Sequence, residues 1–119
     1  MSVRRGEIVL VDFPFSDRTG SKVRPALVVQ DDRWNQSLDD TVLALITSSP
    51  RRMTGAPTQF RIVPGTVEGR QSGLTVLSVV QCENLSIFDQ QLVIKTLGSL
   101  PPAAMAAVDD CLKAALGLS

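Results

Sequence analysis

The stretch 41-TVLALIT-47, near the middle of the chain, decides the fold class. Its apolar residues run almost without interruption between two threonines, and polar and turn-forming residues follow from position 48. A short apolar run bounded in this way is typical of a strand that is covered on both faces. We therefore expect residues 41–47 to form a buried strand.

Further strands are expected on both sides of this one. EIVLVDF at residues 7–13 is rich in β-branched side chains and stops at Pro14. Residues 26–30 form the next strand, which Pro25 precedes because proline cannot donate a hydrogen bond to a sheet. Towards the C-terminus the predicted strands are 58–63, 74–80 with a continuation over 82–87 after a bend, and 92–97.

The segments between these strands have loop composition. They contain Ser, Pro, Gly and Asp without apolar periodicity, and they cover residues 16–22, 48–57 and 64–73. Residues 31–35 are the exception, where we expect a short helical turn capped by an Asp.

The last segment has a helical period. Two prolines open it at 101–102, and Gly117 follows its last apolar residues, which is typical punctuation for a helix. The apolar residues recur at steps of three and four: Met105, Val108, Leu112, Ala115 and Leu116. We expect one helix here, with its apolar face covering a sheet or a partner.

Length and composition favour a single domain over residues 1–119. With 44% hydrophobic residues in 119, the chain can bury one sizeable core. Six or so short strands and one terminal helix predict a mainly β fold, and closure into a small twisted barrel would remove exposed strand edges.

The sequence also indicates a compartment. No apolar run approaches the ~20 residues that span a bilayer, and the start of the chain lacks the pattern of a signal peptide. We expect a cytoplasmic protein without a membrane partner. Its two cysteines, Cys82 and Cys111, are then most simply buried apolar residues, with a disulfide the less favoured alternative.

Two missing residue types restrict the chemistry. The chain has no histidine and no tyrosine, which excludes the commonest general base, the commonest zinc ligand and every histidine-containing triad. Its acidic residues are scattered or in simple pairs, so no metal site and no cofactor is expected. The net charge is zero, yet residues 18–70 hold eight basic and five acidic groups, a balance of +3. On charge alone this segment is an ordinary solvated surface.

Three segments together resemble the MazF/PemK toxin family. They are similar to the family's opening strand, its Arg-Pro motif and its strand that ends in a catalytic Thr. The segments are 5-RGEIVLVDFP-14, 22-KVRPALVVQ-30 and 45-LITS-48. Weaker similarity at 72–74, 78–85 and 94–100 extends the resemblance over nearly the whole chain in order.

The resemblance implies a fold, an activity and partners. The fold is an SH3-like barrel of the CcdB/PemK type with a terminal helix, assembled as a homodimer. The activity is that of a toxin that inhibits growth as a sequence-specific endoribonuclease (an mRNA interferase), cutting single-stranded RNA without a metal. A cognate MazE-like antitoxin would occlude the RNA groove.

Cleavage without a metal uses the 2′-OH of the RNA as the nucleophile and leaves a 2′,3′-cyclic phosphate and a 5′-OH. The protein must stabilise charge on the phosphoryl oxygens, which suits an Arg and an oriented hydroxyl. The resemblance gives these roles to Arg24 and Thr47. The alternatives are a salt bridge from Arg24 to Asp17 or Asp12, and a turn-capping role for Thr47.

The general base is not assigned by the resemblance. Many members of the family carry a Glu in the loop before Arg-Pro, near the positions of Thr19 and Gly20, and this chain has none there. Asp17 is the nearest carboxylate, and a base supplied by water or by the substrate is the alternative.

Further RNA contacts are expected from the loops on either side of the site. Arg18, Lys22, Arg51 and Arg52 are candidates for phosphate contacts, which position a strand without reading its sequence. Ser48 and Asn84 are candidates for base edges. Phe15 and Trp34 are candidates for base stacking, although packing in the core or in a dimer is the favoured interpretation of Trp34.

Two other function classes remain open at this point. One is a gyrase poison of the kind that CcdB represents, although the chain's closing residues, LGLS at 116–119, do not look like the tail expected for it. The other is a non-catalytic member that binds RNA or an antitoxin, which the missing loop Glu favours.

Overall fold

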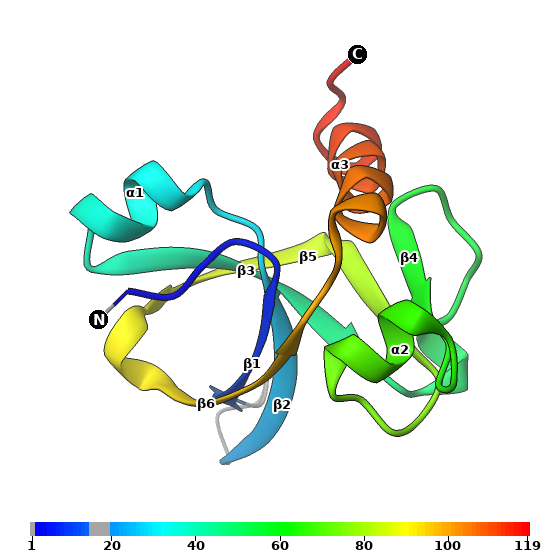
Figure 1. The fold of residues 1–119 in the computed structure, drawn as a ribbon, viewed down its shortest axis with the longest axis horizontal. Helices are drawn as coiled ribbons and strands as arrows, with labels where there is room; N and C mark the ends of the chain where they lie inside the picture. Colours follow the sequence, from blue (N-terminus) through cyan, green and yellow to red (C-terminus); the bar gives the residue numbers. More distant parts are fainter. Residues whose placement is uncertain (1, 15–19) are drawn as a thin grey trace.

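A computed structural model describes residues 2–14 and 20–119 (Figure 1). Its centre is a six-stranded sheet with the order β4-β5-β3-β2-β1-β6, in which all neighbours are antiparallel. The strands are β1 (Glu7–Pro14), β2 (Ser21–Val28), β3 (Asp40–Thr47), β4 (Gln59–Ile62), β5 (Ser78–Asp89) and β6 (Val93–Ser99). The helices are α1 (Asp32–Ser37), α2 (Val67–Ser72) and α3 (Pro102–Leu116), with 3₁₀ turns η1 (Pro50–Arg52) and η2 (Gln90–Leu92). The predicted mainly β fold with a C-terminal helix is confirmed.

The sheet is curled into a half-barrel. Phe13 of β1 and Phe88 of β5 meet with their ring centroids 5.7 Å apart, although two strands separate β1 from β5 in the sheet. A bulge between Gln81 and Leu85 helps β5 to bend along β3, because an extra residue on one strand increases its twist. The apolar residues inside the curl are Val9, Val11, Ala26, Val28 and Leu43.

The other face of the sheet is covered by α3, which stands against β4 and β5 (Figure 1). Alternation along each strand sends Ile8, Leu27 and Ile46 to this face. Met105 and Val108 of α3 pack against them, as the helical period predicts. Burial of each such side chain contributes about 1.5–3 kcal/mol, so this contact fixes α3 on the sheet. Cys82 and Cys111 are free thiols buried in the same cluster, as expected.

The boundaries of two predicted strands were wrong. β2 begins at Ser21, so Ser21 and Lys22 belong to a strand rather than to a loop, and Pro25 lies inside it. Proline is tolerated there because β3 pairs with β2 only from Ala26 onward, which leaves that edge of Pro25 without a neighbouring strand. The strand predicted at 74–80 does continue over 82–87 as β5, but it begins only at Ser78, and residues 74–77 precede it in irregular conformation.

The predicted loop at 64–73 was also wrong, because it contains α2. Thr66 caps this short helix by accepting a hydrogen bond from Gly69 N over 3.1 Å. Gly73 ends the helix in the left-handed conformation, with φ at 78°. The helical turn predicted near residue 31 is present and longer than expected, and Asp31 caps it. None of the helices in the described part of the chain is long and apolar enough to cross a membrane.

Candidate active site

Arg24 and Thr47 line the same pocket, which we call the Arg24–Thr47 pocket. Its volume is about 280 Å³, and it lies between β2, the end of β3 and a wall that precedes β5. The lining residues are Lys22, Val23, Arg24, Pro25, Ile46, Thr47, Ser48, Gly73, Leu74, Thr75, Val76, Ser78 and Leu97. Four of the site residues predicted from the sequence, Lys22, Arg24, Thr47 and Ser48, are therefore brought together.

The register of β2 and β3 explains why these two side chains meet. Ala26 pairs with Leu45, and the residues two positions further on, Arg24 and Thr47, point to the same face of the sheet. The two strands are paired only over Ala26–Val28 of β2, so Arg24, which precedes this paired part, lies where β2 and β3 have moved apart. This divergence leaves the space that the pocket occupies.

The structure shows the turn-capping role that was considered for Thr47. Its side chain is buried, with 3% exposure, and its Oγ1 accepts a hydrogen bond from Ser49 N over 3.1 Å. The turn-capping interpretation is thus confirmed. Accepting this bond fixes the rotamer and leaves the hydroxyl proton for donation, so the cap itself orients a donor beside Arg24.

The third wall of the pocket depends on glycine. A Cβ at Gly73 would lie 2.3 Å from the carbonyl oxygen of Leu97 in β6, and one at Gly98 would lie 2.2 Å from that of Gln71 in α2. The backbones of α2 and β6 therefore approach more closely than any side chain allows. This junction places the irregular residues 73–76 against the pocket.

Sequence reasoning missed two hydroxyl groups in this wall, those of Thr75 and Ser78. Both line the pocket, and Ser78 Oγ donates to Val76 O over 3.0 Å. The sequence pattern of residues 74–80 predicts one continuous strand, so it does not indicate the irregular turn in which Thr75 lies. The signal that was available is the pair Thr66 and Gly73, which marks the two ends of α2.

The pocket suits an anion. Among the described residues that line it, the charged ones are Lys22 and Arg24, and the hydroxyl groups of Thr47, Ser48 and Thr75 add neutral donors. A guanidinium presents several N–H groups in a fixed plane, a geometry that matches phosphate. The arrangement can therefore bind a phosphoryl group and stabilise added negative charge on it.

In the described part of the chain, Arg24 forms no salt bridge with Asp12, one of the two partners considered for it. The ion pairs there join Arg5 to Asp109 and Arg33 to Asp31, and Asp12 takes part in neither. Asp17, the other suggested partner and the candidate base, lies outside the described residues, as do Phe15 and Arg18.

The other predicted contact residues lie apart from the pocket lining. Arg51 and Arg52 are exposed in η1, on the loop that follows Ser48, and Asn84 lies in the bulge of β5. Trp34 is 51% exposed on α1, with the guanidinium of Arg33 5.7 Å from its ring centroid. Of the two kinds of packing considered for Trp34, packing in the core is therefore wrong, because α1 turns this residue outward, while packing in a dimer stays a prediction.

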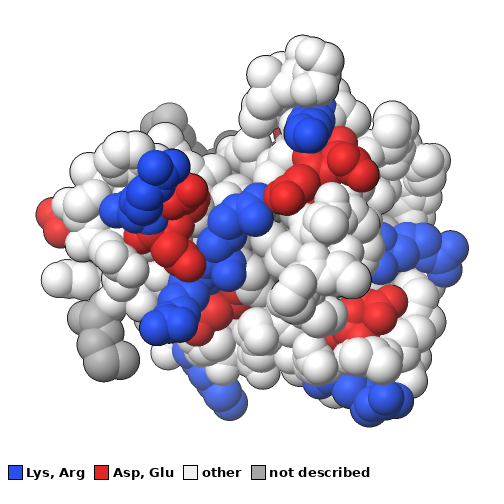
Figure 2. All heavy atoms as spheres, turned by 45° about the horizontal axis from the view of Figure 1, so that its top comes forward, with Lys and Arg blue, Asp and Glu red and all other residues white. Residues whose placement is uncertain are grey.

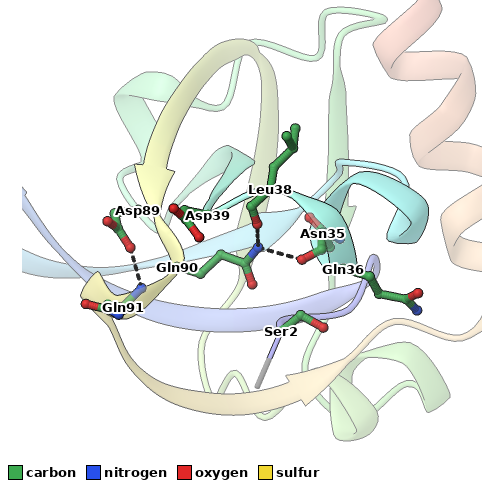
Figure 3. A pocket seen from close by; sticks show the side chains of 8 residues that line it. All are labelled: Ser2, Asn35, Gln36, Leu38, Asp39, Asp89, Gln90 and Gln91. Atoms are coloured by element: carbon green, nitrogen blue, oxygen red, sulfur yellow. Dashed lines mark hydrogen bonds between the residues drawn. The ribbon is translucent and has the colours of Figure 1, made fainter.

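Another cavity, of about 540 Å³, lies between α1 and η2. Figure 3 shows the side chain of Gln90 donating to the backbone oxygens of Asn35 and Leu38, over 2.8 and 3.0 Å. Its Oε1 accepts from Val3 N over 2.9 Å. The amide of Gln90 thus ties three segments of backbone together, so its polar groups have structural partners.

The remaining titratable groups do not suggest a nucleophile. Burial raises the pKa of the Cys82 thiol to about 12, and it raises the pKa of Cys111 as well. Residues 2–14 and 20–119 contain no group of three Cys, Asp or Glu side chains that could hold a metal ion. On the face shown in Figure 2, basic and acidic side chains lie next to one another rather than in one basic patch.

Fold and pocket together define a class, that of small half-barrel proteins with a pocket at the rim of the sheet that two basic side chains line. The chain belongs to the PemK-like, MazF-like toxins of type II toxin-antitoxin systems, whose family model matches residues 4–116. The resemblance seen in the sequence is confirmed.

Relatives and solved structures agree with this family. The endoribonuclease MazF of Staphylococcus epidermidis is 28% identical over 98% of this chain and 93% of its own length. The endoribonuclease EndoA of Bacillus subtilis (strain 168) is also 28% identical, over 99% and 97%. A mycobacterial endoribonuclease solved in complex with its cognate antitoxin has the same fold, with a TM-score of 0.78 and 24% identity over 99% of this chain and 98% of that one. Both relatives carry the name of the enzyme class that the sequence predicts.

Proposed function

We propose that this chain is an endoribonuclease toxin that cuts single-stranded RNA at specific short sequences without a metal ion. The observation that supports this most is the meeting of Arg24 and Thr47, from two diverging strands, in one positively charged pocket. Family membership and the names of the two relatives support the reaction class.

The reaction uses the substrate's own nucleophile. The 2′-OH attacks the adjacent phosphorus, the bond from phosphorus to the 5′-oxygen breaks, and a 2′,3′-cyclic phosphate and a 5′-OH result. Arg24 donates to the phosphoryl oxygens, where negative charge grows, and supplies a proton or hydrogen bond to the leaving 5′-oxygen. Thr47 donates its hydroxyl proton to the scissile phosphate, and the hydrogen bond from Ser49 N holds it in place.

The attacking 2′-OH must lose a proton to an acceptor. We keep Asp17 as the candidate, with water or a group of the substrate as the alternative. Phosphates of the flanking nucleotides would contact Lys22 at the pocket and Arg18, Arg51 and Arg52 in the loops. Ser48 at the pocket edge and Asn84 in the bulge are the proposed contacts for base edges.

The proposed assembly follows the family. We propose a homodimer whose RNA groove is occluded by a cognate MazE-like antitoxin; the mycobacterial endoribonuclease of similar fold was solved in complex with its own cognate antitoxin. The substrate, mRNA, places the action of the toxin in the cytoplasm.

The test is cleavage of a long single-stranded RNA by the purified chain in excess EDTA, with the 5′ ends mapped. Specific cuts should be lost in Arg24→Ala and Thr47→Ala. The matched controls are Arg33→Ala and Thr96→Ala, which change exposed residues outside the pocket and should leave the cuts unchanged. Full activity of Arg24→Ala would overturn the assignment. Absence of cutting by the wild type would instead favour a non-catalytic toxin, and gyrase inhibition would then be measured.

A further inference from the structure

A third cavity lies beside the Arg24–Thr47 pocket, where residues 48–58 join β3 to β4. Its volume is about 590 Å³, within the range of sites for small organic groups. Met53, Ala56 and Val79 form apolar parts of its lining, and Gln59 and Arg61 form polar parts. We call it the loop cavity.

The register of the sheet puts the loop cavity next to the proposed scissile phosphate. Thr47 of β3 pairs with Val79 of β5, and Val79 pairs with Arg61 of β4. Residues directly opposite in antiparallel strands point to the same face, so these three side chains form one row. The row leads from the Arg24–Thr47 pocket, at Thr47, into the loop cavity, at Val79 and Arg61. Since neighbouring strands lie about 5 Å apart, the span from Thr47 to Arg61 is about 10 Å.

The lining of the loop cavity matches the chemistry of a nucleobase. Apolar walls from Met53 and Val79 offer a polarisable surface to a flat ring. Arg61 is exposed at the edge, where its guanidinium plane can stack on a base or pair with the phosphate beside it. An unpaired base with its phosphate needs this combination of walls and donors.

The loop that covers the cavity is held by one amide. Gln59 Oε1 accepts from Thr54 N over 3.0 Å, and its Nε2 donates to Arg52 O over 2.8 Å and to Glu83 Oε2 over 2.9 Å. Glu83 Oε1 also accepts from Thr58 Oγ1 over 2.8 Å. We call this set the Gln59–Glu83 brace. A loop fixed before the ligand arrives loses less entropy on binding, so the brace favours recognition.

The next row of the same face holds an unused acceptor. Gln81 pairs with Leu45 on one side and with Gln59 on the other, and it is only 5% exposed. Its Nε2 is 3.5 Å from Glu83 Oε2, and its Oε1 has no hydrogen-bond partner in the described part of the chain. Turning the amide round would set its oxygen against the carboxylate of Glu83. A buried carbonyl oxygen without a donor is costly, but Gln81 does not line the loop cavity, so this oxygen is not one of its ligand contacts.

We propose that the loop cavity binds the base of a nucleotide next to the cleaved bond, and that this subsite sets part of the RNA sequence preference. Arg61 and the apolar walls contact the nucleotide, and the Gln59–Glu83 brace positions the loop. The proposal rests on the proposed function, since it takes its ligand from the RNA bound in the Arg24–Thr47 pocket.

The test compares two variants by mapping cuts in RNA of random sequence. Ala56→Phe fills the cavity from the loop. Gln59→Glu removes both donated hydrogen bonds and sets a second carboxylate against Glu83, with no change in size. The controls make the same changes at exposed positions on helices, Ala106→Phe and Gln36→Glu.

We expect the preference at one or two adjacent positions, on one side of the cut, to fall about tenfold in both variants, with the other positions and both controls unchanged. Preferences that are unchanged in both variants, or that fall equally at all positions, would overturn the proposal. Circular dichroism checks the fold, and Arg61→Gln, at an exposed side chain, takes the place of Ala56→Phe if that variant does not fold.

Failure of the proposed function would be seen separately. If the wild type cuts no RNA, the proposed function is wrong, and the subsite is tested by binding of fluorescent 2′-O-methyl oligonucleotides of uniform base. Tighter binding of one base, lost about tenfold in Gln59→Glu but not in Gln36→Glu, would support the subsite. Equal binding of all bases to the wild type would overturn it.

Discussion

The junction of α2 and β6 holds one wall of the Arg24–Thr47 pocket, and three Gly→Ala variants test it. Gly73 has φ at 78° and would place a Cβ 2.3 Å from Leu97 O, so it is required both for its left-handed backbone conformation and for the close contact with β6. Gly98 carries only the contact, with a Cβ 2.2 Å from Gln71 O. Gly65 carries only the backbone requirement, with φ at 88° and nothing within 4 Å.

The expected losses of unfolding free energy follow from these two requirements. The left-handed conformation costs a residue with a Cβ about 1–2 kcal/mol, which is the whole expectation for Gly65→Ala. Forcing backbone atoms apart costs about 1–3 kcal/mol, which is the expectation for Gly98→Ala. Gly73→Ala should lose about 2–5 kcal/mol, the sum of both, a large part of the about 5–15 kcal/mol that stabilises a typical domain. All three share the same gain from a less flexible unfolded chain.

Urea unfolding followed by circular dichroism measures these differences. Gly73→Ala should also cut RNA more slowly under conditions where it is still folded, because its wall of the pocket must move. The reasoning would be refuted if Gly73→Ala were no less stable than Gly65→Ala, since the close approach of α2 to β6 would then contribute nothing.

Four further predictions concern individual side chains. Thr47→Val should reduce the cleavage rate about 10²-fold, and it should lower the unfolding free energy by about 1 kcal/mol because a backbone N–H loses its acceptor. Thr47→Ser should retain most of the cleavage rate and most of the stability. Equal activity of the two variants in a cleavage assay would contradict the role of the hydroxyl. Arg24→Lys should reduce cleavage by about tenfold or more at unchanged stability, because an ammonium keeps the charge without the planar fork, and wild-type rates would contradict this. Partial burial alone would raise the pKa of Glu83, but hydrogen bonds from the Gln59 and Thr58 side chains outweigh it and lower that pKa below 4.5. The wild type should therefore be more stable than Glu83→Gln above pH 4.5, and this difference in unfolding free energy should shrink as the pH falls below 4.5. Urea titrations at several pH values would show it. Cys82 and Cys111 should react with a thiol reagent at pH 8 only as fast as the protein unfolds locally, because burial keeps both thiols protonated. Fast reaction of the folded chain would contradict this and would indicate looser packing of α3.

The repeating patterns of the sequence predicted the parts of the fold that depend on local periodicity. The apolar run before Thr47 gave a strand, and the three- and four-residue steps around Val108 gave the helix with its punctuation at Gly117. Strand β2 was mistaken because Pro25 looks like a strand boundary. Only the register with β3 shows that its missing N–H meets no neighbouring strand.

The site was predictable to the extent that it depends on motifs. Arg24 and Thr47 were singled out by the resemblance to the MazF/PemK family, and the structure places both in the lining of one pocket. The wall with Thr75 was not found, since its place depends on the contact of Gly73 with β6, two segments far apart in the chain. The sequence could not decide between a buried and an exposed Trp34, because that depends on how α1 is placed against the sheet.

The Gln59–Glu83 brace could not be predicted from the sequence either, because it also joins segments that are far apart in the chain. Gln59 and Glu83 are 24 positions apart, and neither belongs to a motif. Antiparallel pairing of β4 with β5 brings them together. Contacts of this kind arise from register, which a one-dimensional pattern does not contain.

The central claim is that the Arg24–Thr47 pocket cleaves RNA by attack of the 2′-OH without a metal ion. Its most direct test is an oligonucleotide that contains a mapped cleavage site, made as RNA and with a single 2′-deoxy substitution at the attacking nucleotide, each incubated with the protein in excess EDTA. We expect the all-RNA strand to be cut into a 2′,3′-cyclic phosphate and a 5′-OH, and the substituted strand to stay intact. Cutting of the substituted strand at an undiminished rate, or cutting of the RNA only when Mg²⁺ is restored, would contradict the account.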